Sequence, residues 1–387
     1  MRIRTYPRAH ILQTFQRHCE TLAANGNAGY QEEFEELSDT AKEFSCRAGE
    51  LDANKNKNRY PFILPYDHCR VKLSLLESQP HSDYINASYV PGGSTEHDFI
   101  CTQAPLPSTM ADFWRMIWEQ NVQVIVMVTS LKEYGKVLCN QYWPPERGTG
   151  CYGALQVTTV SRHRGPDCYI TTIHLRQHGS PTDRHITHYY YPGWLDQGVP
   201  KNHTSLVKFT DHVRRQLDDA PNLGPTVVHC SAGIGRSGTF VAILWLIQLC
   251  ARGILPDVRL AVRDLRRHRV LMVQNVEQYI LVHQCILHWL GGNTERPRTQ
   301  NVVSFKIEKP QKHRQSKRDP ENRRRNSDHT HQPKVSPSSL QASHTPQPQH
   351  TAWQSLRDSL HAFNPGKLLQ RFRPPSSQNN SQLETQL

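Results

Sequence analysis

The chain has 387 residues, of which 36% are hydrophobic, and a formal net charge of +12. This length can form one large domain or two small ones with a sizeable core. Apolar periodicity ends near Leu290, and residues 293–387 hold 16 Lys and Arg against 7 Asp and Glu, which is +9 of the total charge. The composition therefore predicts one globular domain followed by a basic, disordered tail, and it excludes a domain that is itself strongly basic.

The ten cysteines are scattered through the domain without CxxC pairs, and the tail has none. This pattern argues against a zinc module and a secreted disulfide framework, and it favours a reducing, cytoplasmic location. The first residues lack the apolar core of a signal peptide, and the longest apolar runs, at 122–128 and 239–250, are too short to span a bilayer. The sequence indicates a soluble protein, although the intracellular part of a longer receptor would look the same.

In the first half of the chain, residues 11–37 are expected to form a helix, because apolar or aromatic residues recur at helical spacing. A polar, proline-containing loop over residues 55–73 then leads into a strand. Aromatic residues at helical spacing predict a helix over residues 110–121. Short β-type runs lie around this helix, at residues 83–90, 98–104 and 122–130.

In the second half, strands are expected over residues 155–163, 168–177 and 185–191. A helix over 206–217 precedes a short β-branched run at 226–230. The last helices are expected over residues 237–250, 258–268 and 275–290. Mixed strands and helices, with the helices concentrated at both ends, predict an α/β or α+β domain with a central mixed sheet flanked by helices.

The stretch VVHCSAGIGRSGTF, residues 227–240, has the strongest chemical signal. If residues 226–230 form a strand and a helix begins near Ser237, the intervening loop points its backbone N–H groups at a helix N-terminus, where they can hold a tetrahedral oxyanion. The same field and a nearby cation lower the pKa of the Cys230 thiol, so that it becomes a nucleophile. Arg236 can hold two phosphate oxygens at once, and Ser237 can steady the thiolate. The implied chemistry is phosphoryl transfer to sulfur followed by hydrolysis.

This stretch has two alternative interpretations. The glycines could form only a tight turn around a cysteine buried as a small apolar residue. A nucleotide-binding loop of the GxxxxGK[ST] type is excluded because the required lysine does not occur.

With these features the sequence resembles the tyrosine-specific, cysteine-based protein tyrosine phosphatases, over roughly residues 30–290. The motifs follow the order of that family and read KNRY (57–60), DYINAS (83–88), TQAPL (102–106), CNQYWP (139–144), GWLDQGVP (193–200) and QNVEQY (274–279). YQEEFEEL and LPYDHCRVKL look most like single-domain receptor-type members. The resemblance implies an N-terminal helical extension over 1–29, a phosphatase domain over 30–292 and the tail over 293–387.

The resemblance also assigns roles. Cys230 is expected to be the nucleophile, and Asp196 the general acid and then the general base. Gln274 and Gln278 are expected to position the hydrolytic water, and Tyr60 to stack on the substrate ring. His229 would support the thiolate, and Glu133 would buttress the arginine. The phosphoryl oxygens would be bound by Ser231, Ala232, Gly233, Ile234, Gly235 and Arg236.

Each role has a structural alternative. Asp196 could be a turn former, Tyr60 a core aromatic residue and Gln278 a surface residue of its helix. His185 and His188, in HITH, could suggest a metal site, but no third ligand is apparent and a strand near the acid loop explains them better. The motifs imply no metal or organic cofactor.

Five positions depart from the family pattern. Leu195 precedes Asp196 where a proline is usual, which should loosen the acid loop. Phe62 replaces a residue that grips the substrate backbone, and Leu138 replaces a lysine that contacts the acid loop. Ala104 and Asn275 are milder changes. We therefore expect a working but slow phosphatase acting on phosphotyrosine proteins.

Two rival functions remain open. One is a phosphotyrosine-binding pseudophosphatase, which would capture substrates without efficient turnover. The other is a dual-specificity or phosphoinositide phosphatase, which the recognition motif at Tyr60 disfavours.

The tail, residues 293–387, has no tyrosine and no expected core. Residues 312–327 are basic enough to bind acidic lipid headgroups, an import receptor or nucleic acid without sequence specificity, and a solvated linker is the alternative. Residues 353–363 place apolar side chains on one helical face and are expected to fold on a protein partner or a membrane.

Overall fold

The computed structural model describes residues 4–37, 44–165, 167–194, 198–200, 202–219 and 224–292. These residues all fall within one compact unit. The expected tail segments and the residues Leu195 and Asp196 lie outside the described residues.

A mixed sheet of nine strands forms the centre of the domain. The four central strands run parallel, and the outer strands pair antiparallel. In spatial order the strands are β1 (Arg70–Lys72), β2 (Tyr84–Val90), β3 (Phe99–Thr102), β11 (Thr226–His229), β4 (Val124–Met127), β10 (Asp183–Tyr190), β9 (Cys168–Gln177), β8 (Leu155–Gly165) and β7 (Thr149–Tyr152). A separate small hairpin joins β5 (Lys132–Glu133) to β6 (Lys136–Val137).

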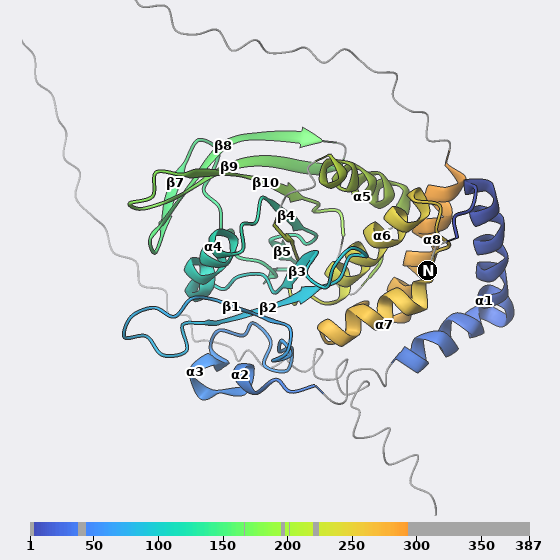
Figure 1. Ribbon diagram of the computed structural model, residues 1–387, viewed down its shortest axis with the longest axis horizontal. Helices are drawn as coiled ribbons and strands as arrows, with labels where there is room; N and C mark the ends of the chain where they lie inside the picture. Colours follow the sequence, from blue (N-terminus) through green and yellow to red (C-terminus); the bar gives the residue numbers. More distant parts are fainter. Residues whose placement is uncertain are drawn as a thin grey trace, which may run out of the picture. The chain divides into compact units, whose positions relative to one another are not determined.

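Helices cover both faces of the sheet, as Figure 1 shows, with α4 on one side and the terminal helices on the other. The chain forms α1 (Arg8–Glu36), α2 (Arg47–Glu50), α3 (Asp52–Lys55), the 3₁₀ turn η2 (Pro107–Thr109), α4 (Met110–Glu119), α5 (His203–Asp218), α6 (Gly235–Ala251), α7 (Val258–His268) and α8 (Val276–Gly291). The predicted α/β fold, a central mixed sheet flanked by helices, is confirmed.

Strand β11 shows why the central strands are continuously apolar. Val227 belongs to the apolar cluster on the α4 side, and Val228 belongs to the cluster on the opposite side. Alternate side chains of a strand face opposite sides of a sheet, so a strand covered on both faces buries every residue. The predicted β-branched run at 226–230 thereby lies at the middle of the core.

Helix α1 is the main departure from the expected elements. Its backbone leaves the helical region from Ala24 to Asn27, and Asn25, Gly26 and Asn27 have positive φ. Asn and Gly tolerate this left-handed conformation better than other residues, which is why the chain can bend here. The expected single helix over 11–37 is therefore two helical halves, and α1 packs mainly against α8.

The remaining helices begin at side-chain caps where the sequence offers them. Asn202, Asp257 and Asn275 each accept a hydrogen bond from a backbone N–H of the first turn of α5, α7 and α8. Asn275 therefore keeps a capping role at the position where it departs from the family pattern. Within the described part of the chain, no helix combines the length and the apolar character needed to cross a membrane.

Candidate active site

The loop after β11 wraps around the sulfur of Cys230. The Gly233 N–H donates to Sγ at 3.2 Å, and Gly233 has a φ of +72°. A Cβ atom at Gly233 would lie 2.2 Å from the carbonyl oxygen of Thr102, which is far too close. Glycine is therefore required both by the backbone conformation and by the contact with β3. The structure confirms the predicted strand, loop and helix at this position.

The electrostatic environment of Cys230 favours the thiolate. Burial by itself would raise the pKa of the thiol, because charge is poorly solvated in the core. The Arg236 guanidinium, the Ser237 hydroxyl and N–H donation from the loop oppose this effect, and the net pKa is lowered. Ser237 Oγ is buried and makes no well-formed hydrogen bond within the described residues, so it can turn toward the sulfur.

Arg269 binds the backbone carbonyls of the loop, a role that the sequence did not reveal. Its side chain is fully buried, and Nε donates to the Gly233 carbonyl at 2.8 Å while Nη2 donates to the Ala232 carbonyl at 3.0 Å. The same guanidinium donates to Asn86 Oδ1 at 2.7 Å and to Ser88 Oγ at 3.1 Å on β2. These bonds turn the two loop carbonyls away from the sulfur, which leaves the loop N–H groups to face the opposite direction. The only available signal was an arginine in a basic helix end, RRHR, which resembles a solvated charge run.

His229 supports the loop through a directed chain of hydrogen bonds. Its Nδ1–H donates to the Cys230 carbonyl at 3.1 Å, so its Nε2 must accept, and the Tyr142 hydroxyl donates to it at 2.7 Å. The Tyr142 oxygen in turn accepts from His188 Nε2 at 2.8 Å. Burial lowers the pKa of His229 to about 4 and that of His188 to about 3, so both rings are neutral at pH 7.

The two histidines of the HITH motif do not lie together, and His188 belongs to the hydrogen-bond network of Tyr142 and His229. His188 is buried and contacts Tyr142, whereas His185 Nε2 faces His174 Nε2 at 3.1 Å on an exposed part of β10. The two histidines are three residues apart on a strand and therefore face opposite sides of the sheet.

Arg236 connects the loop to the segment that carries the expected general acid. Its side chain is buried, and Nη1 donates to the Trp194 carbonyl at 3.1 Å. Trp194 is fully buried, and its indole N–H donates to the Gly198 carbonyl at 3.0 Å. The two ends of this segment are thus tied together beside Arg236, while Asp196 itself lies outside the described residues.

The two glutamines of the QNVEQY motif lie over the start of α6. A Cβ atom added to Gly235 would come within 2.9 Å of Oε1 of both Gln274 and Gln278. Gln278 is buried, and its Oε1 accepts from the Gln274 N–H at 2.9 Å. The structure therefore brings both amide side chains to the loop of residues 231–236, and the suggestion that Gln278 is a surface residue is wrong.

Tyr60 lies at the rim of the same loop. Its hydroxyl is 2.8 Å from Ser231 Oγ, and Ser231 Oγ donates to the Leu138 carbonyl at 2.9 Å. Tyr60 is half-buried, so it is not a core residue. Leu138 is buried, whereas Phe62 is 81% exposed, which leaves an apolar ring in solvent beside the site.

Arg59 anchors the recognition motif to the core segment after β3. Its guanidinium donates to the carbonyls of Ala104 and Pro105, both at 3.0 Å, and to Asn140 Oδ1 at 2.9 Å. Ala104 in turn donates its N–H to the Ser231 carbonyl at 3.0 Å. Arg59 was missed by the sequence reasoning, although the KNRY motif contains it. The pairing of Glu133, on β5, with Arg236 stays a prediction.

The arrangement can perform one kind of chemistry especially well. A buried thiol with a lowered pKa accepts a hydrogen bond from the Gly233 N–H, the Arg236 guanidinium favours its charged form, and two glutamine amides face the same loop. Such a site binds a tetrahedral oxyanion over a sulfur nucleophile. Fold and site together define a cysteine-based phosphatase centre.

The comparisons with known proteins agree with that class. The protein-tyrosine phosphatase family model matches residues 54–288. The chain is 42% identical over 282 residues to a Lar-like tyrosine-protein phosphatase of Caenorhabditis elegans, covering 72% of this chain and 13% of that protein. It is 39% identical over 277 residues to the rat receptor-type tyrosine-protein phosphatase V, with 72% and 16% covered. It is 41% identical over 281 residues to the rat phosphatidylinositol phosphatase PTPRQ, with 72% and 12% covered.

The chain therefore belongs to the protein-tyrosine phosphatase family. It spans 12–16% of the length of these three relatives, and the similarity concerns the phosphatase domain.

Proposed function

We propose that this domain hydrolyses phosphotyrosine in proteins through a cysteinyl-phosphate intermediate, at a reduced rate. The observation that carries the proposal is the lowered pKa of Cys230 inside a loop of oxyanion-binding N–H groups. The rim position of Tyr60, beside Ser231, supports a deep pocket that suits an aryl phosphate.

The reaction has two steps. The Cys230 thiolate attacks phosphorus, the bond to the tyrosyl oxygen breaks, and Asp196 protonates the leaving oxygen. Water, oriented by Gln274 and Gln278, then attacks the phosphorus of the cysteinyl-phosphate intermediate and Asp196 takes its proton. The S–P bond breaks, inorganic phosphate leaves and the thiolate is restored. Arg236 and the loop N–H groups hold the phosphoryl oxygens in both steps.

The reduced rate follows from the acid segment. Proline fixes φ, whereas a leucine before Asp196 leaves the backbone more conformations. More conformational freedom must therefore be lost each time Asp196 takes up its catalytic position. A displacement of about 1 Å of a catalytic group can cost on the order of a hundredfold in rate. Exposed Phe62 also lacks the polar atoms that would hold a peptide backbone.

The test is single-turnover kinetics on a phosphotyrosine peptide with the full chain and three variants. Phosphate release that Cys230→Ser abolishes and Asp196→Ala slows strongly would support the mechanism, and a gain with Leu195→Pro would place the handicap in the acid segment. Peptide binding without release above the Cys230→Ser background would instead favour the pseudophosphatase. Because one relative is named a phosphatidylinositol phosphatase, a phosphoinositide should be assayed beside the peptide, and faster release from it would refute the tyrosine preference.

The same proposal covers location and partners. We propose a cytoplasmic setting, since all ten cysteines are free, as expected for a reducing compartment. The phosphotyrosine proteins would be substrates, and residues 312–327 of the tail would bind an acidic lipid surface, an import receptor or another protein. Unchanged localisation and pull-down partners after deletion of residues 353–363 would remove the partner-helix hypothesis.

A further inference from the structure

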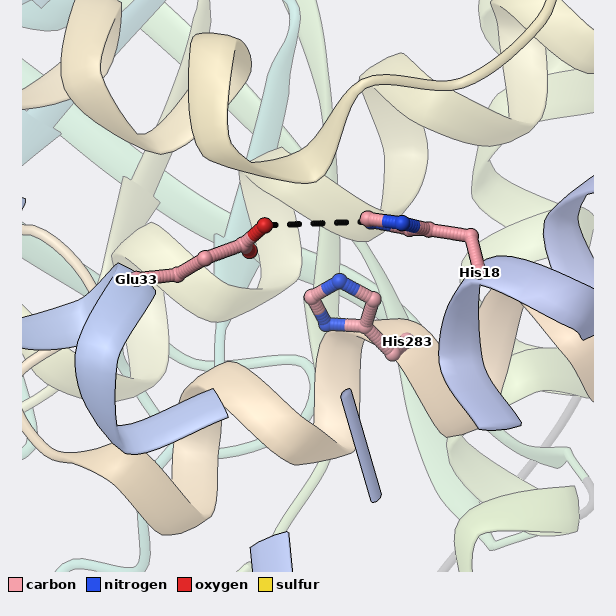
Figure 2. Close-up of side chains that lie close together, drawn as sticks. All are labelled: His18, Glu33 and His283. Atoms are coloured by element: carbon pink, nitrogen blue, oxygen red, sulfur yellow. Dashed lines mark ion pairs between the residues drawn. The ribbon is translucent and has the colours of Figure 1, made fainter. Parts of the chain in front are cut away.

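Three potential metal ligands meet on the helical side of the domain, away from the loop of Cys230. His18 lies on the first half of α1, Glu33 on its second half and His283 on α8. One ligand atom from each residue lies within 4.8 Å of the others. Figure 2 shows His283 between the other two side chains, with one ring nitrogen facing the His18–Glu33 ion pair. The bend of α1 at residues 24–27 makes this meeting of two segments of one helix possible.

His283 has an unsatisfied nitrogen that faces this group. The ring is fully buried, and its Nδ1–H donates to the Tyr279 carbonyl at 3.0 Å. Its Nε2 must therefore carry the lone pair, and it has no hydrogen-bond partner among the described residues. A buried polar atom without a partner is rare in folded proteins and calls for an explanation.

The other two groups are also prepared as ligands. Glu33 Oε2 accepts from the Tyr279 hydroxyl at 2.6 Å, and Oε1 is 3.9 Å from His18 Nε2. In metal sites, a ligating histidine commonly donates its other N–H to a backbone carbonyl, and a ligating carboxylate is itself hydrogen-bonded. Tyr279 supplies both of these supports, with its carbonyl for His283 and its hydroxyl for Glu33.

We propose that His18, Glu33 and His283 bind a divalent transition-metal ion, zinc by the chemistry of the ligands, with water as the fourth ligand. Two imidazoles and one carboxylate form a known zinc ligand set, whereas magnesium and calcium prefer oxygen alone. Metal bonds of about 2.0–2.1 Å require the ligand atoms to be about 3.4 Å apart, so the group must contract by roughly 1 Å. The His18 side chain is 48% exposed and can make this movement, and it also opens a path for the ion.

The ion would fasten both halves of α1 to α8. Tyr279 directly follows Gln278, so the metal-supporting residue lies next to the glutamine that faces the phosphate-binding loop. The competing explanation is packing alone, because the Phe15 ring stacks on His283 at 5.7 Å and Tyr30 meets it edge-on at 5.0 Å. Packing explains the ring faces of His283 but gives Nε2 no partner, whereas a metal ion would satisfy it.

The test is titration of the full chain with Zn²⁺ and with Co²⁺. We expect one equivalent to bind, with a Co²⁺ absorption spectrum of nitrogen and oxygen ligands and no thiolate charge-transfer band. His18→Ala and Glu33→Gln should each weaken binding at least tenfold, and His10→Ala, another exposed histidine of α1, should leave it unchanged. Free Zn²⁺ at about a hundred times its dissociation constant should raise Tm by about 5 °C in the wild type and not in His18→Ala.

The proposal is overturned if no single equivalent binds, or if His18→Ala binds the ion as tightly as the wild type. It is also overturned if the binding is lost in Cys230→Ser and kept in His18→Ala, since the ion would then belong to the thiolate. The two ligand variants place the test on exposed or partly exposed side chains, which can be changed without opening the core. None of these binding and stability measurements depends on phosphatase activity.

Discussion

Replacing Arg269 with lysine should disable the phosphate-binding loop while keeping its positive charge. The guanidinium makes four hydrogen bonds of 2.7–3.1 Å from three different nitrogens to loop carbonyls and to β2. A lysine has a single nitrogen with at most three N–H donors, so it cannot bond the loop carbonyls and the β2 side chains at the same time. Hydrogen bonds to a charged group contribute about 1.5–3 kcal/mol each, and we expect a loss of unfolding free energy of about 3 kcal/mol after partial replacement.

The effect on turnover should be larger than the effect on stability. Released carbonyls of Ala232 and Gly233 can turn toward the sulfur, and a shift of about 1 Å costs on the order of a hundredfold in kcat. The pH dependence of Cys230 alkylation should change little, because the positive charge stays and Arg236, the main group that lowers this pKa, is untouched. The assay is kcat on an aryl phosphate together with urea unfolding. Arg267→Lys is the matched control, since that arginine lies two residues earlier and is exposed. A folded Arg269→Lys protein with kcat within threefold of the wild type would refute this account of the loop.

The other predictions concern the loop glycine, the thiol and the buried histidines. Gly233→Ala should lower kcat at least a hundredfold, because the added Cβ would lie 2.2 Å from a backbone oxygen. The control is Gly179→Ala, where φ is +78° and no atom lies within 4 Å, and it should cost only about 1 kcal/mol of stability. Equal effects of the two substitutions would contradict the steric argument. Iodoacetamide should label Cys230 at a lower pH than the other buried cysteines, as mass spectrometry can show, and labelling of Cys230 only at the pH at which those cysteines react would contradict the lowered pKa. The free energy of unfolding should fall as the pH drops from about 6.5 to about 4, because histidines bind protons in the unfolded state while the buried rings stay neutral in the fold. The expected decrease is about 1.4 kcal/mol per pH unit for each histidine. The rings concerned are His188, His229 and His283, with pKa values lowered to about 3, 4 and 4. Urea unfolding across this range should show the slope reduced by about a third in His283→Gln, and an unchanged slope would show that His283 titrates normally in the fold.

Much of the site could be predicted because its groups are close in sequence. Cys230, Gly233 and Arg236 lie in one strand–loop–helix unit, and local backbone rules determine which way such a loop points its N–H groups. Gln274 and Gln278 were found through a motif, and the structure brings them to the loop. Arg269 was missed because its partners, on β2 and in the loop, lie 36 to 183 residues away along the chain. Nothing in the RRHR run distinguishes the buried Arg266 and Arg269 from the exposed Arg267 between them.

Helix α1 gives the same lesson at the level of an element. The apolar residues that predicted this helix, from Ile11 to Leu37, are buried. The periodicity of those positions continues on both sides of the NGN sequence, so it could not show that the chain bends there. The meeting of His18 with Glu33, and of both with His283 on α8, depends on that bend and on the packing of α1 against α8.

The sequence by itself determined the order of the longer strands and helices, the buried strand that ends directly before Cys230 and the chemistry of the loop after it, but it did not reveal the short elements α2, α3, β5, β6 and β7. These features follow from periodicity, β-branched residues and the backbone freedom of glycine, which act over a few residues. Only the tertiary structure decided which buried polar groups pair, such as Arg269 with the loop carbonyls and His229 with Tyr142, and it left His283 Nε2 without a partner among the described residues. A buried polar atom must find its partner wherever the fold places one, and that distance in space is not encoded in the distance along the chain.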